Sequence, residues 1–124
     1  MSVATSPVIG FKDNEVQGQH SAIPADRVLS GKPEQVLWNH FQDSSKQMVS
    51  GIWECSPGKW TANYATKNEF CHILSGQAIL SDVAGNSKEY SAGDSFVIPA
   101  GFVGTWEVVE TVRKLYVIVE PKDR

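Results

Sequence analysis

The sequence predicts an all-β protein, a single-domain β-barrel of the jelly-roll type with an irregular N-terminal arm. Short stretches with the composition of β-strands follow one another from Val36 onward. Residues that favour turns separate these stretches at short intervals. No segment keeps a helical spacing of apolar residues over about a dozen positions. A chain of about eight or nine short strands with glycine-rich turns is typical of a sandwich or barrel.

The length of 124 residues suits one domain. Residues 1–34 contain Pro7, Pro24 and Pro33 and only scattered apolar residues, which predicts an arm lying on the domain, with a short edge strand as an alternative. We expect the barrel over residues 35–124, with strands at 35–41, 47–55, 60–64, 69–74, 77–82, 88–90, 95–98, 104–110 and 112–120. Ser75-Gly76 is expected to form a tight hairpin, since glycine accepts positive φ.

Composition excludes several classes of partner. The net charge is -3 and no stripe of Lys and Arg is present, which argues against a nucleic-acid partner. The longest apolar run, near residues 115–119, is too short to cross a membrane, and residues 1–10 lack the pattern of a signal peptide. Cys55 and Cys71 are expected to be free, buried thiols. We therefore expect a cytoplasmic protein.

Two segments share the spacing of a known pair of motifs. Six residues separate Glu69 from Gly76, and Gly58 lies upstream. Further on, residues 93–101 read Gly, five residues, then Pro-x-Gly. These segments resemble the two motifs of the cupins, which implies an RmlC-like jelly roll, also called a double-stranded β-helix, and a homodimer. The resemblance covers about residues 49–119 and leaves the arm unexplained.

A narrower resemblance is to the cupins that look like ureidoglycine aminohydrolase. It is carried by Trp53 and by residues 58–60, 69–71, 93–96, 101–107 and 113–116. The resemblance implies the fold more firmly than it implies a substrate. The family reaction depends on a metal, so we do not transfer it to this chain.

The chain departs from the metal-binding pattern that the resemblance implies, three histidines and one glutamate. The histidine positions hold other residues: Ala62 and Tyr64, or Asn63 and Ala65, and then Gly104. The histidines of the chain lie outside the motifs, at positions 20, 40 and 72. Only Glu69 remains, and one carboxylate does not hold a transition metal. We therefore expect no metal and no cofactor, although Glu69 with Cys71 could begin an unusual site.

Glu69 is the first candidate functional residue. On a strand it shares a face with Cys71, while His72 points the other way. A carboxylate inside a barrel must find a hydrogen-bond donor. Glu69 would then anchor a substrate or act as a general base, or it would only bond a nearby Trp, Tyr or amide.

The other candidate ligand-binding residues are Asn63, Tyr64, Cys71, Trp106 and Trp60. Trp106 shares the inward face with Gly104 and would fill the space of the missing imidazoles, bond a ligand or Glu69, or simply pack the core. Trp60 and Tyr64 share a strand face, as a pocket wall or a cover. Asn63 would orient a polar ligand or cap a turn. Cys71 is otherwise a small core residue.

On the outer face, His72 lies between Phe70 and Leu74, an apolar stripe of the kind that a second subunit often covers. A solvated charged hairpin is expected from Glu107, Glu110, Arg113 and Lys114. Three functions remain open. They are a barrel that binds a small polar metabolite without catalysis, a metal-independent enzyme that uses Glu69 as base on a nitrogen-containing metabolite, and an assembly module with a filled barrel.

Overall fold

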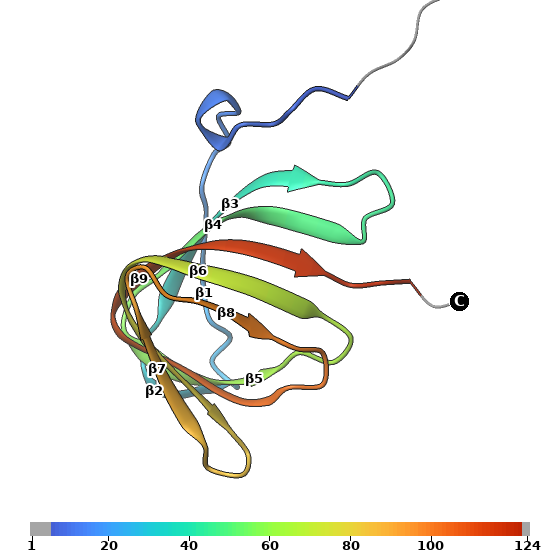
Figure 1. Cartoon of the computed structure of the whole chain (residues 1–124). Helices are drawn as coiled ribbons and strands as arrows, with labels where there is room; N and C mark the ends of the chain where they lie inside the picture. Colours follow the sequence, from blue (N-terminus) through green and yellow to red (C-terminus); the bar gives the residue numbers. More distant parts are fainter. Residues whose placement is uncertain (1–5, 123–124) are drawn as a thin grey trace, which may run out of the picture.

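A computed structural model describes residues 6–122, which form one curled antiparallel sheet (Figure 1). Its strands are β1 (Gln19–Ala22), β2 (Val28–Gly31), β3 (Glu34–Gln42), β4 (Met48–Cys55), β5 (Gly58–Asn63), β6 (Asn68–Asp82), β7 (Ser87–Ser91), β8 (Ser95–Ile98) and β9 (Val103–Val119). The order β1-β3-β4-β9-β5-β2 runs along the sheet, and β6 pairs with β7, β8 and β9. The predicted all-β jelly-roll architecture is confirmed.

Strands β6 and β9 are the long members of the sheet and pair along nearly their whole length. Beyond this pairing, β9 also joins β4 and β5, while β6 joins β7 and β8. Each long strand therefore hydrogen-bonds to three other strands, and Figure 1 shows β6 and β9 curving together.

The predicted hairpin at Ser75-Gly76 is wrong, because β6 runs through both residues. The pairing with β9 shifts register there, and Gly76 has φ +90°. A Cβ on Gly76 would lie 2.1 Å from the carbonyl oxygen of Thr111. Glycine therefore lets two backbones approach closely at an irregularity that bends the strand without reversing it. Likewise, the two strands expected over 104–110 and 112–120 are one strand, β9.

Residues before position 35 take part in the sheet. Strand β1 pairs with β3, and β2 pairs with β5. Ahead of them, a short 3-10 helix, η1 (Phe11–Asp13), brings the Phe11 ring onto His40 of β3, with ring centroids 4.5 Å apart. The proposed division at 34/35 falls at the start of β3, and the separation into an arm and a barrel stays a prediction.

The core lies inside the curl of the sheet, where alternate residues of β4, β5, β6 and β9 meet. Burial alternates clearly in the second half of β9, where Val112, Lys114 and Tyr116 are buried and the residues between them are less so. Cys55 and Cys71 are buried free thiols, as predicted. Within residues 6–122 there is no helix long and apolar enough to cross a membrane.

Candidate functional site

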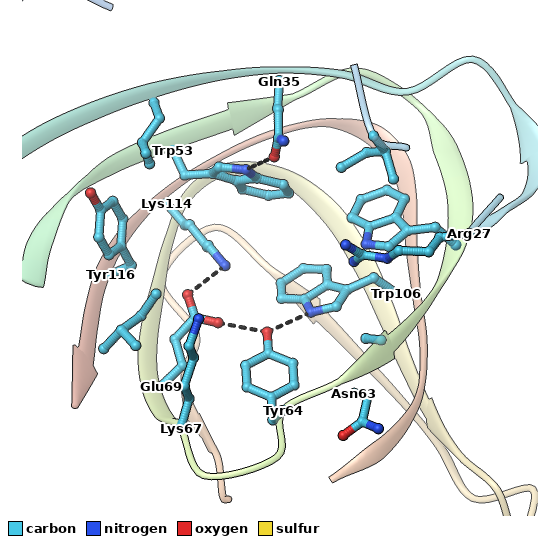
Figure 2. A pocket seen from close by; sticks show the side chains of 15 residues that line it. Arg27, Gln35, Trp53, Asn63, Tyr64, Lys67, Glu69, Trp106, Lys114 and Tyr116 are labelled. Carbon is cyan, nitrogen blue, oxygen red and sulfur yellow. Dashed lines mark hydrogen bonds and ion pairs between the residues drawn. The ribbon is translucent and has the colours of Figure 1, made fainter. Parts of the chain in front are cut away.

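A cavity of about 300 Å³ lies within the barrel. Apolar and aromatic side chains form much of its wall: Ile23, Leu37, Trp53, Trp60, Ala62, Trp106 and Ile118. Polar and charged side chains complete it: Arg27, Gln35, Asn63, Tyr64, Lys67, Glu69, Lys114 and Tyr116. Figure 2 shows these groups converging from several strands and from the turns near the mouth.

Glu69 faces the cavity, and only 4% of it is exposed. Its Oε1 accepts a hydrogen bond of 2.6 Å from the Tyr64 hydroxyl. Its Oε2 accepts one of 2.9 Å from the Lys114 ammonium. Both carboxylate oxygens therefore have protein partners, and the charge of Glu69 is balanced inside the barrel.

The solvated position expected for Lys114 is wrong, because its side chain is buried and lines the cavity. Strand alternation explains the error: Lys114 shares a face with the buried Val112 and Tyr116. Arg113 takes the outer face, where it pairs with Glu54 at 3.3 Å. The apolar residues two positions away on each side were the signal that could have placed Lys114 inside.

The Lys114 ammonium is enclosed by aromatic rings as well as by Glu69. Its Nζ lies 4.5 Å from the ring centroid of Trp53 and 4.3 Å from that of Trp106. Such distances allow cation–π attraction, which is stronger where water is excluded. Burial is the largest single influence and disfavours the charged form, but Glu69 and Cys71 together outweigh burial and raise the pKa of the Lys114 ammonium. Lys114 therefore carries its charge in the interior.

Tyr64 connects the ion pair to the tryptophans. Its hydroxyl donates to Glu69 and accepts a hydrogen bond of 3.0 Å from Trp106 Nε1 (Figure 2). Burial, followed by the negative charge of Glu69, raises the pKa of Tyr64 above its ordinary value. Tyr64 is thus a neutral relay between the indole and the carboxylate, so Trp106 reaches Glu69 only through Tyr64.

Three tryptophans pack around this network. Trp60 and Trp106 are cross-strand partners on β5 and β9, and their rings are parallel within 4° at 6.2 Å. Trp53 contacts Trp106 at 5.6 Å and donates a 2.7 Å hydrogen bond to Gln35. Trp60 and Trp106 thus serve both as core and as cavity wall.

Asn63 and Cys71 are placed differently from the other candidates. Asn63 lies at the exposed rim of the cavity, where its side-chain oxygen accepts a 3.0 Å bond from the backbone amide of Ala65. Cys71 is fully buried and is not part of the cavity wall. Burial raises the pKa of its thiol to about 12. The structure therefore brings Tyr64, Glu69, Trp60 and Trp106 to one cavity, with Asn63 at its edge and Cys71 behind it.

The residues present do not fit a divalent metal ion. Ala62 on β5 and Tyr64 just after it line the cavity, and Gly104 is paired with Ala62. A Cβ at Gly104 would lie 1.9 Å from the carbonyl oxygen of Ser81, so no side chain projects there. Among residues 6–122, no three His, Cys, Asp or Glu side chains converge. The cation beside Glu69 is the Lys114 ammonium.

Comparisons with known proteins agree with this fold. The family model of the EutQ-like cupin domain matches residues 42–116, which is more than half of the chain. The comparison with curated proteins found no match.

Three solved structures illustrate the structural similarity. A DUF861-family protein of unknown function from Pseudomonas syringae is 22% identical, with a TM-score of 0.75 over 86% of this chain and 46% of its own. EutQ from Clostridium difficile is 18% identical, with a TM-score of 0.63 over 73% of this chain and 65% of its own. A DUF861-family protein from Thermotoga maritima is 33% identical, with a TM-score of 0.51 over 53% of this chain and 74% of its own. The chain thus spans less than two thirds of the first two proteins.

Proposed function

This chain belongs to the EutQ-like cupin domain family, and from that premise we propose that its barrel binds a small polar metabolite. The observation that carries the proposal is the cavity of about 300 Å³ around the buried Lys114–Glu69 pair. Small-molecule sites are mostly apolar cavities in which a few polar groups orient the ligand. Glu69, Tyr64 and Lys114 are such groups here, held in place by their mutual hydrogen bonds.

The cavity argues against an assembly module with a filled barrel. Trp106 occupies interior space, as the sequence predicts, but open volume remains beside it. A module that only packed against other proteins would have no need to keep a polar network in this volume. Ligand binding accounts for both the open volume and the Lys114–Glu69 ion pair that lines it.

Catalysis of the ureidoglycine aminohydrolase type has less support. A general base needs a free lone pair directed at its substrate. Each oxygen of Glu69 already accepts a bond, from Tyr64 or from Lys114, so only part of its accepting capacity is left for a substrate proton. The narrower resemblance to that family therefore stays a prediction, as does the cytoplasmic location, with which two free buried thiols are compatible.

A thermal-shift screen of small polar metabolites tests the proposal. We expect individual compounds to raise the melting temperature in a concentration-dependent way. Each of these compounds should also change the tryptophan emission, because Trp53, Trp60 and Trp106 line the cavity. Replacing Trp38, which does not line the cavity, by Phe should leave this change intact, whereas Trp60→Phe should reduce it.

A matched pair of variants locates the binding. Ala62→Leu adds volume to the cavity wall and should abolish the response, while Thr61→Leu, the exposed neighbour on β5, should preserve it. If Ala62→Leu proves too unstable to purify, the comparison of Trp60→Phe with Trp38→Phe gives the same information. The proposal fails if no metabolite stabilises the protein, or if the compounds act equally on the Ala62→Leu and Thr61→Leu proteins.

A further inference from the structure

The charges around the cavity are not balanced. Four charged side chains line it: Arg27, Lys67, Glu69 and Lys114. Glu69 and Lys114 neutralise each other at 2.9 Å in the floor. In the described part of the chain the only other ion pair is Arg113–Glu54. Arg27 and Lys67 therefore contribute two positive charges that no carboxylate of residues 6–122 neutralises by direct contact.

The backbone holds Arg27 at the mouth of the cavity. The residue lies in the turn between β1 and β2, and its carbonyl oxygen accepts a 2.9 Å bond from the Thr61 amide. Its Nε donates to the Thr61 carbonyl oxygen at 3.2 Å. A guanidinium has five N–H donors, so the terminal nitrogens keep a free pair of donors that suits a carboxylate. Arg27 is among the labelled side chains that line the cavity in Figure 2.

Lys67 lines the cavity on the side opposite to Arg27. It lies in the loop between β5 and β6, where its amide donates a 2.8 Å bond to the carbonyl oxygen of Tyr64. In Figure 2 its side chain lies on the side of Glu69, and the Arg27 side chain lies across the cavity. The two exposed cations thus flank the opening above a floor of zero net charge.

The hydrogen-bonding inventory favours a ligand that accepts hydrogen bonds. Arg27 and Lys67 present donors at the mouth, while the carboxylate in the floor already accepts from Tyr64 and Lys114. Below the mouth, Trp60 and the other aromatic and aliphatic residues supply flat, apolar walls. Such walls suit a planar or apolar body better than a second charged group.

We propose that this cavity binds a small monocarboxylate with a planar apolar body, its carboxylate held by Arg27 and Lys67 and its body against Trp60. This inference rests on the proposed function and names the class of ligand. A bare inorganic anion would meet the two cations but leave the apolar walls unused. The observations therefore favour an organic acid over free phosphate.

Fluorescence titration of the whole chain tests this with benzoate, its neutral analogue benzamide, and inorganic phosphate. We expect benzoate to bind, and Arg27→Gln to weaken it by about 10-fold to 100-fold, as loss of a charge-assisted hydrogen bond does. Lys67→Gln should weaken the binding of benzoate less than Arg27→Gln does, because an exposed ammonium acts as a single point charge. Lys59→Gln, on the outward face of β5, is the control with the same charge change and should bind benzoate normally.

The outcomes separate this inference from the proposed function. If benzamide binds as tightly as benzoate, or if Arg27→Gln leaves benzoate unaffected, the cavity binds ligands but the carboxylate assignment is wrong. If phosphate displaces benzoate at equal concentration, the role of the apolar walls is wrong. If benzoate does not bind, the assignment is overturned, and the metabolite screen still decides independently whether the cavity binds anything.

Discussion

Lys114 and Glu69 meet in a part of the barrel where only 5% of each side chain is exposed to water. Removing two ions from water is costly, and mutual attraction offsets the cost only with good geometry and further hydrogen bonds. Here Tyr64 satisfies the second oxygen of Glu69, and two indole rings face the ammonium. In this chain the cation beside Glu69 is therefore the Lys114 ammonium, where the resemblance implies a metal ion.

Removing one member of the pair should destabilise the protein strongly. We expect Lys114→Met to lower the free energy of unfolding by about 3–5 kcal/mol, because it leaves Glu69 buried without its counter-charge. Arg113→Met is the control on the same strand, and it removes an exposed pair worth about 0–1 kcal/mol. Urea unfolding measures both.

The double variant Lys114→Met/Glu69→Gln identifies the cause of that loss. Since the neutral amide no longer needs a counter-charge, the double variant should be more stable than Lys114→Met alone. A double variant as unstable as the sum of the two single variants would show that packing, and not the uncompensated charge, dominates.

The sequence was informative about some side chains and misleading about one. With Glu69 taken to face the interior, strand alternation correctly placed Cys71 on the same face and His72 on the other, because the side-chain period of a strand is two. Lys114 was missed because charge was weighed above position: Glu107, Glu110, Arg113 and Lys114 together look like a solvated segment. Sequence alone could not show that a lysine would find its carboxylate on another strand.

At the scale of the elements, the curvature of the sheet depends on the irregular region of β6. Gly76 combines φ +90° with a backbone approach that excludes any side chain. The sequence showed that Gly76 needed special backbone freedom but not how it was used. A positive φ serves a tight turn as well as a bulge, and only the pairing with β9 across the barrel distinguishes them.

A pair of glycine substitutions separates the need for a positive φ from the need for space beside the backbone. Gly85 has the same φ of +90°, but nothing lies within 4 Å of a Cβ added there. Gly85→Ala should therefore cost about 1–2 kcal/mol from backbone strain alone. Gly76→Ala should cost about 1–3 kcal/mol more, because its Cβ would overlap the carbonyl of Thr111. Equal losses in urea unfolding would contradict the close approach of β6 and β9.

At the scale of the whole molecule, one outer face of the barrel is apolar. Phe70 and Leu74 on β6 and Val97 on β8 are exposed, and Phe70 pairs directly with Val97. The homodimer stays a prediction, and this face is where we expect it to form. Sedimentation equilibrium should give a dimer for the natural chain and a monomer for Phe70→Glu. Val83→Glu, an exposed control away from the stripe, should remain dimeric; a natural chain that is monomeric throughout would exclude the dimer.

The buried titratable groups of the barrel predict loss of stability in alkali. Burial raises the pKa of Cys55 and Cys71 from 9.0, and that of Tyr116 from 10.0, each to about 12. At a pH between the ordinary pKa of each group and its raised pKa in the folded protein, the unfolded chain has released a proton that the folded chain keeps. The free energy of unfolding therefore falls as the pH rises. The raised pKa of Lys114 acts in the same direction, because its unfolded form also loses the proton first.

Urea unfolding across this range should therefore show stability falling from near pH 9 towards pH 12, the window set by those pKa values. Each proton of difference contributes a slope of about 1.4 kcal/mol per pH unit. Cys55→Ala removes one of these groups and should give a shallower decline, whereas Lys59→Gln, at an outward-facing position of β5, should leave the slope unchanged. A flat stability profile would mean that the interior is far more hydrated than its packing indicates, since only free access to water would return these groups to their ordinary pKa values.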